Sequence, residues 1–147
     1  MSEQNKAVVR RLFEELWNKG NLPMADELFA PNYANHDPST PDFGRGPENE
    51  KKGVSLYRGA FPDLRLTIED MIAENDTVTA RWSCRGTHKG DLSGIAPTGK
   101  QIMISGMSIV RLANGKVVES WANWDALGLM QQLGVAPQLT KAKGAAT

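Results

Sequence analysis

The chain has 147 residues, 40% of them hydrophobic, with 17 Lys and Arg against 17 Asp and Glu and a single cysteine, Cys84. One cysteine excludes an internal disulfide framework and a thiolate metal cluster, and zero net charge argues against a nucleic-acid partner, which requires a basic surface. No apolar run approaches the roughly 20 residues needed to cross a bilayer, and the first residues lack the pattern of a signal peptide. We therefore expect a cytoplasmic protein with no membrane partner, made of one domain over residues 1–134 and a frayed tail over 135–147.

Helical periodicity dominates the first part of the chain. Apolar residues spaced three and four apart predict an amphipathic helix over residues 3–19. A shorter helix is expected over 23–29, opened by a proline, and a third over 47–61. The intervening residues 30–47 contain four prolines and no sustained pattern, so they predict a long loop, which in a compact domain is usually functional or mobile.

After Pro62 the period of the apolar residues changes to two, which indicates strands. The predicted strands cover residues 64–73, 77–88, 100–112 and 116–124. Asn114-Gly115 is a strong hairpin signal between the last two, and a short helix closes the domain over 127–133. Helices followed by an antiparallel sheet predict an α+β fold, and a curved sheet folded over helices leaves a pocket between the two layers.

The third predicted strand is apolar on both faces. One face carries Ile102, Ile104, Val110 and Leu112, and the other carries Met103, Met107 and Ile109. A strand with two apolar faces in an antiparallel sheet implies that something packs on the outer face as well. Because few residues remain to do so, we infer a homodimer formed through the sheet.

Asp125 is the strongest candidate for acid/base chemistry. Strict alternation places Asp125 on the same face of the fourth strand as Trp121. If that face lines the pocket, desolvation raises the carboxyl pKa toward neutrality, as a general acid/base requires. The alternative is that Asp125 caps the helix beginning at Ala126, a common position for Asp, and it could do both.

Two histidines and five apolar side chains complete the candidate site. His88 ends the strand face that carries Trp82 and Cys84, and His36 lies in Asn35-His36-Asp37-Pro38. Either could move a proton near neutral pH, although a lone histidine is more often a hydrogen-bonded structural residue. The candidate substrate-binding residues are Trp82, Trp121, Met107, Tyr33 and Phe61. Because no HxH, HxxxH or CxxC spacing is present, no metal site is predicted.

Several segments together resemble the SnoaL-like polyketide cyclase, or ester cyclase, family of the nuclear-transport-factor-2-like superfamily. They are residues 60–74, 78–82, 85–90 with the motif Arg85-Gly86-Thr87-His88, 96–100, and 114–134 with its closing Trp-rich strand and helix. The resemblance covers roughly residues 5 to 134. It implies a cone-shaped fold, in which a strongly curved antiparallel sheet of about four to six strands packs on three N-terminal helices and encloses one pocket. It also implies a dimer through the sheet.

The resemblance further implies a reaction. Characterised members close a polyketide ring by intramolecular aldol condensation without a metal or organic cofactor. Their acid/base aspartate matches Asp125, and histidines near their pocket match His36 and His88. We therefore predict a cofactor-free cyclase or isomerase acting on an apolar, carbonyl-bearing small molecule, with a histidine stabilising the enolate oxygen.

Two other functions remain open at this stage. A non-catalytic small-molecule-binding or stress-response module of the same fold predicts that Asp125 only caps a helix. An interaction protein that uses only its dimer surface predicts a filled cone without a cavity.

Overall fold

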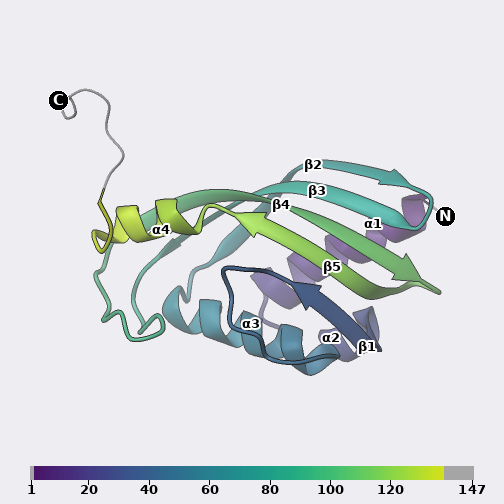
Figure 1. Cartoon of the computed structure of the whole chain (residues 1–147), viewed down its shortest axis with the longest axis horizontal. Helices are drawn as coiled ribbons and strands as arrows, with labels where there is room; N and C mark the ends of the chain where they lie inside the picture. Colours follow the sequence, from purple (N-terminus) through teal and green to yellow (C-terminus); the bar gives the residue numbers. More distant parts are fainter. Residues whose placement is uncertain (1, 138–147) are drawn as a thin grey trace.

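The computed structural model describes residues 2–137. Its centre is a five-stranded curved sheet with the N-terminal helices beneath it (Figure 1). The elements are α1 (Ser2–Arg11), the π-helix η1 (Leu12–Asn18), α2 (Met24–Leu28), β1 (Phe29–His36), α3 (Pro47–Ala60), β2 (Arg65–Glu74), β3 (Thr77–Thr87), β4 (Gln101–Ala113), β5 (Lys116–Trp124) and α4 (Ala126–Leu133). Most of the predicted tail, residues 138–147, lies outside the described residues. No helix within residues 2–137 is long and apolar enough to span a membrane.

The sheet has the strand order β1-β5-β4-β3-β2 and is mixed. Each of the strands β2 to β5 pairs antiparallel with the next one along the chain, as predicted. β1, in contrast, pairs parallel with β5. The α+β fold is confirmed, five strands agree with the four to six that the resemblance implies, and the hairpin is confirmed by positive φ angles at Asn114 and Gly115. The expectation that the sheet is purely antiparallel is wrong.

The predicted loop over residues 30–47 contains a strand that the sequence pattern did not indicate. β1 buries Phe29, Ala30 and Tyr33 but includes Pro31 and exposed polar residues, so no alternation is visible. Proline is tolerated there because β1 is an edge strand with only one partner. The loop prediction is therefore wrong for residues 30–36.

A β-bulge in β5 reverses which side chains face the helices. Leu112 pairs with Val117, but Arg111 pairs with Glu119, so Val118 is an extra residue on β5. A bulge of this kind re-aims the side chains that follow it. As a result the inner face carries Val117 before the bulge and Ser120, Ala122 and Trp124 after it.

The apolar core lies between the inner face of the sheet and the N-terminal helices. Its most buried side chains include Val9, Leu16, Leu28, Phe29, Val54, Val78 and Val117. The prediction that β4 is apolar on both faces is confirmed. Ile102 and Ile104 are buried in the core, whereas Met103 and Met107 lie on the outer face, where they are 57% and 55% exposed in this chain.

Candidate active site

The layer between sheet and helices contains a cavity of about 150 Å³. It is bounded by η1, β1 and α3 on one side and by the inner face of β3, β4 and β5 on the other. Its apolar walls include Phe13, Phe61, Leu66, Trp82, Ile104 and Trp124. The prediction that the fold encloses a pocket is confirmed, and the filled cone expected of a pure interaction protein is not what the structure shows.

Glu50 is the carboxyl group inside this cavity. It lies on α3, where its oxygens accept hydrogen bonds from Trp17 Nε1 at 3.0 Å and from the Tyr33 hydroxyl at 3.1 Å. Burial raises the pKa of Glu50 above its usual value, and the charge of Asp37 raises it further, while the two hydrogen bonds oppose this effect. A carboxyl group whose pKa is shifted upward is suited to exchange a proton near neutral pH.

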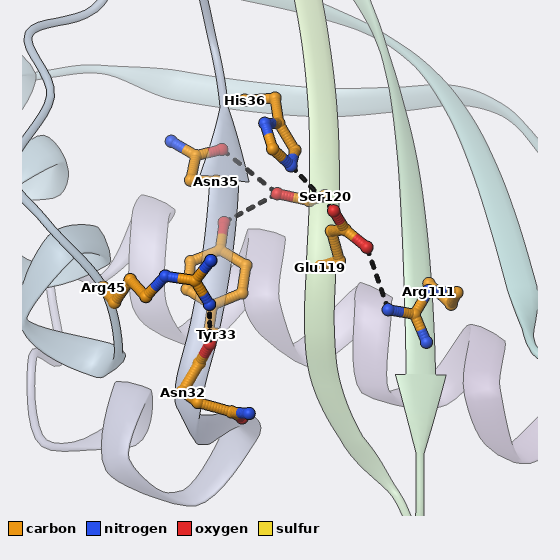
Figure 2. Close-up of polar contacts among 8 residues, drawn as sticks. All are labelled: Asn32, Tyr33, Asn35, His36, Arg45, Arg111, Glu119 and Ser120. Carbon is orange, nitrogen blue, oxygen red and sulfur yellow. Dashed lines mark hydrogen bonds and ion pairs between the residues drawn. The ribbon is translucent and has the colours of Figure 1, made fainter.

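The hydroxyl of Tyr33 connects Glu50 with the sheet. It lies 2.6 Å from Ser120 Oγ, which in turn donates to Asn35 Oδ1 at 3.1 Å (Figure 2). Burial and the neighbouring charge of Glu50 hold the pKa of Tyr33 well above its usual value. The hydroxyl therefore keeps its proton and can donate a hydrogen bond into the cavity.

Asp37 lies at the mouth of the cavity, just after β1 ends. Its carboxylate accepts hydrogen bonds from Ser39 N at 2.9 Å, Thr40 Oγ1 at 2.7 Å and Trp124 Nε1 at 3.1 Å. Thr40 Oγ1 also lies 2.8 Å from the hydroxyl of Tyr57 on α3. These contacts fix the carboxylate between the loop, the helix and the sheet.

Three of the five predicted substrate-binding residues line the cavity. Tyr33, Phe61 and Trp82 are among its walls. Met107 lies on the outer face of the sheet, so its predicted place in the pocket wall is wrong. Trp121 also points outward because the bulge at Val118 shifts the alternation, and it lines an open cleft next to the cavity instead.

Asp125 occupies the helix-capping position that the sequence left open as an alternative. Its Oδ1 accepts a hydrogen bond of 2.8 Å from Gly128 N at the start of α4. The residue is exposed and is not among those that line the cavity. Its acid/base role therefore stays a prediction that rests on the family resemblance.

The two histidines lie in separate places. His88 is fully buried at the end of β3, where its Nδ1 accepts from Thr98 N at 3.1 Å and its ring packs on Phe61. Phe61 lines the cavity, whereas His88 does not. His36 lies on the outer side of β1 and pairs with Glu119 at 2.8 Å (Figure 2). The structure thus brings neither histidine to the inner cavity, and their catalytic roles stay predictions.

Sequence reasoning missed Glu50 and the role of Asp37 at the mouth. Glu50 lies in the N-terminal turn of α3, where acidic residues are common and need no functional explanation. A signal was present, since Glu50 precedes Val54 by four residues and Tyr57 by seven, so it falls on the apolar stripe of its helix. Within residues 2–137, no group of three His, Cys, Asp or Glu side chains is arranged to hold a metal ion.

The fold and the cavity define an α+β protein whose curved sheet and helices enclose an apolar cavity that is lined by a carboxyl group of raised pKa. The family model described as SnoaL-like polyketide cyclase matches residues 7–133, and the chain belongs to this family. Aklanonic acid methyl ester cyclase AcmA of Streptomyces galilaeus is 33% identical over 138 residues, which cover 91% of this chain and 92% of the relative.

Solved structures agree with this assignment. A polyketide cyclase candidate from Acidithiobacillus ferrooxidans superposes with a TM-score of 0.81 at 34% identity, covering 91% of this chain and 96% of the other. AclR of Streptomyces galilaeus, a hydroxylase candidate, has a TM-score of 0.86 at 26% identity, covering 100% of this chain and 95% of the other. The predicted family is confirmed, and with it the interpretation of the chain as an enzyme of the polyketide cyclase type.

Proposed function

We propose that this protein closes a ring in a polyketide-like methyl ester by general acid/base catalysis without a cofactor. The observation that carries the proposal is Glu50, a carboxyl group with an upward-shifted pKa in an apolar cavity, hydrogen-bonded to Tyr33. The substrate class follows from the relative, whose name gives aklanonic acid methyl ester as its substrate.

Glu50 takes a proton from a carbon next to one carbonyl group of the substrate. Once Glu50 carries this proton, the hydroxyl of Tyr33 no longer donates to it and can donate its single hydrogen bond to the enolate oxygen that develops, which is the charge most in need of stabilisation. The enolate carbon attacks a second carbonyl of the same molecule, and the proton returns from Glu50 to the oxygen of the attacked carbonyl. One carbon–carbon bond forms, and no atom is gained or lost.

Asp125, His36 and His88 remain part of the proposal through the resemblance alone. Asp125 would compete with Glu50 for the acid/base role, and the histidines would donate to the enolate oxygen. The geometry favours Glu50 over Asp125, because Glu50 lines the cavity and accepts a hydrogen bond from Tyr33 there, whereas Asp125 does not line it.

Ring closure by two variants and the wild-type chain separates the two carboxyl assignments. Aklanonic acid methyl ester is the assay substrate, and Glu50→Gln, Asp125→Asn and the wild-type chain are compared by chromatography of the cyclised product. Loss of a general acid/base reduces turnover by about 10²–10⁴-fold, and we expect this loss for Glu50→Gln. Asp125→Asn should keep the cap, because Asn serves as well as Asp at this position, and should stay within about tenfold of the wild type.

The opposite result, in which Asp125→Asn abolishes turnover and Glu50→Gln does not, would transfer the acid/base role to Asp125. Unreduced turnover in both variants would remove carboxyl catalysis from the proposal.

A non-catalytic binding module of the same fold is the second candidate function. It is favoured by the exposed, helix-capping position of Asp125, which is what that alternative predicts. It predicts that the wild-type chain binds the methyl ester in the cavity and returns it unchanged after prolonged incubation.

The remaining features of the proposal concern the whole chain. We propose a cytoplasmic homodimer formed through the outer face of the sheet, because that face exposes Met103, Met107 and Ile109. The domain would cover residues 1–134, in keeping with the family match over 7–133.

A further inference from the structure

Four polar side chains form one row of hydrogen bonds from the inside of the cavity to its mouth. Glu50 Oε1 lies 3.1 Å from the hydroxyl of Tyr33. That hydroxyl lies 2.6 Å from Ser120 Oγ, which lies 3.1 Å from Asn35 Oδ1 (Figure 2). All four residues line the cavity, and Asn35 also lines the open cleft outside it. The row therefore connects the carboxyl group inside the cavity with an amide at the mouth.

The number of hydrogens in this row depends on the charge of Glu50. Each contact needs one hydrogen between its two oxygens, and a hydroxyl group has a single hydrogen to donate. With Glu50 ionised and the carbonyl oxygen of Asn35 facing Ser120, the row has three contacts but only the hydrogens of two hydroxyl groups. Two oxygens would then face each other at hydrogen-bond distance with no hydrogen between them, which is unfavourable.

Two arrangements supply a hydrogen to every contact of the row. In the first, Glu50 is protonated and donates to Tyr33, which donates to Ser120. Ser120 then donates to the carbonyl oxygen of Asn35. In the second, Glu50 is ionised, both hydroxyl groups have turned round, and the amide of Asn35 has turned over so that Nδ2 donates to Ser120. An amide can do both because it has donors and an acceptor. Each hydroxyl keeps its own hydrogen, so the arrangements differ by the one proton on Glu50.

The other titratable groups of the cavity lie outside the row. They are Asp37, Tyr57 and Cys84, and no Lys, Arg or His is among the residues of the described chain that line the cavity. Burial raises the pKa of Tyr57 above its usual value and that of Cys84 to about 12, so both keep their protons. The charge of Asp37 acts on Glu50 but adds no hydrogen to the row.

We propose that Ser120 and Asn35 are positioning residues for the acid/base chemistry of Glu50. The proposal rests on the proposed function, in which Tyr33 donates first to the ionised Glu50 and then to the enolate oxygen. The hydrogen of Tyr33 is free for either partner only when Ser120 donates to Tyr33 instead of accepting from it. With Ser120 in that orientation, only the turned amide of Asn35 fits beside its oxygen. The orientation of this amide is therefore coupled to the ionisation of Glu50.

Side-chain amide signals in nuclear magnetic resonance test the coupling without turnover. The signals of Asn35, identified by their absence from Asn35→Leu, should shift as the pH rises, with the same midpoint as the carboxyl carbon signal of Glu50. In Glu50→Gln this step should be absent. Asn49 is the matched control, because its amide also lies at the cavity but donates to Gly44 O at 2.8 Å, outside the row. A shift caused by the charge of Glu50 alone would appear at Asn49 as well.

Ser120→Ala removes the hydroxyl that joins the two ends of the row. Glu50 should still titrate in this variant, but the signals of Asn35 should no longer follow it. Ser120→Thr keeps a hydroxyl on the same atom of the side chain and should restore the coupling. The melting temperature is measured for every variant. Should Ser120→Ala lower it, Tyr33→Phe takes its place, because it keeps the ring and interrupts the row one step earlier, with the same loss of coupling expected.

In the cyclase assay, Ser120→Ala should lower kcat about three- to tenfold, the usual contribution of one hydrogen bond, and leave KM near the wild-type value. Ser120→Thr should keep both. The inference is overturned if the signals of Asn35 ignore the titration of Glu50 in the wild type, or follow it unchanged in Ser120→Ala. Full turnover by Glu50→Gln, together with intact coupling in the wild type, would contradict the proposed function and leave the coupling of Asn35 to Glu50 in place.

Discussion

The buried carboxyl group of Glu50 lowers the stability of the fold, but it lies where the proposed chemistry needs it. A carboxylate loses its hydration on entering an apolar cavity, which is why burial raises its pKa. Trp17 and Tyr33 recover part of this cost by donating to its two oxygens. The folded state therefore holds the proton of Glu50 more tightly than the unfolded chain does.

Stability should consequently fall as the pH rises through the titration of Glu50. Below its usual pKa of 4.5 the carboxyl is protonated in both states. Between pH 4.5 and the raised pKa of the folded state, Glu50 is ionised in the unfolded chain but still protonated in the folded one. The free energy of unfolding therefore falls as the pH rises through this interval. Each unit between the two pKa values costs about 1.4 kcal/mol. Glu50→Gln should thus be more stable than the wild type above neutral pH, and the gain should vanish near pH 4.

The control for this prediction is Glu48→Gln, on the same turn of α3. Glu48 is exposed and pairs with Lys51 at 3.0 Å, so its replacement should change stability by less than about 1 kcal/mol. Urea denaturation of the three proteins across the pH range measures the differences. A stability gain for Glu50→Gln that is independent of pH would contradict the link to its ionisation.

The candidate site was only partly predictable at the level of residues. Phe61 and Trp82 line the cavity as expected, because an aromatic residue on an apolar face generally faces the interior, and Tyr33 lines it as well although its segment was expected to be a loop. Glu50 was missed because an acidic residue near a helix N-terminus has an ordinary explanation. Only the position of α3 against β1, which brings Glu50 to Tyr33, reveals its environment.

At the level of elements, most of the fold follows from side-chain periodicity. α3 and the strands β2 to β5 were predicted to within about two residues, because each has one face in water and one in the core. β1 was not predictable in this way, since its pairing partner β5 comes about 80 residues later and its proline and two asparagines suggest a turn.

The bulge at Val118 had the largest consequence for the site prediction. One extra residue exchanged the inner and outer faces of β5 from Glu119 onward. The side chains of Ser120 and Trp124 therefore reach the cavity, and Trp121 reaches the outer cleft. Nothing in the sequence around Val118 distinguishes this strand from one without a bulge.

A second testable feature lies on β4, where Gly106 packs closely against Trp82 and Trp124. A Cβ on Gly106 would collide with the ring of Trp82 and lie 2.7 Å from the Cβ of Trp124. Both tryptophans line the cavity. Overpacking of a core typically costs about 1–3 kcal/mol, so Gly106→Ala should lower the free energy of unfolding by about 2 kcal/mol.

Because the rings of Trp82 and Trp124 must shift in this variant, ring closure should slow as well. Gly59→Ala is the control, since a Cβ on this exposed residue of α3 meets nothing within 4 Å. It should stabilise the helix by about 0.5–1 kcal/mol. Denaturation followed by tryptophan fluorescence compares the two, and equal stability of Gly106→Ala and the wild type would refute the packing argument.

At the scale of the whole molecule, the outer face of the sheet carries apolar side chains that no other part of the described chain covers. The exposed apolar residues on it are Ile72, Met103, Met107, Ile109 and Trp121. Two of the charges on this face are paired within the chain, Arg81 with Asp70 and Arg111 with Glu119. A twofold axis would bring the same apolar patch of two copies together.

Ile109→Lys tests whether a second copy covers this face. Ile109 is 43% exposed and pairs with Trp121 across β4 and β5, near the middle of the apolar patch. A lysine in each copy would place two unpaired charges in the contact, and burying an unpaired charge is costly. We expect sedimentation to show a dimer of the 16.1 kDa chain for the wild type and a monomer for Ile109→Lys. Leu127→Lys, at an equally exposed apolar residue on α4, should remain a dimer. Dissociation by the α4 variant instead would move the interface from the sheet to the end of the molecule that carries α4.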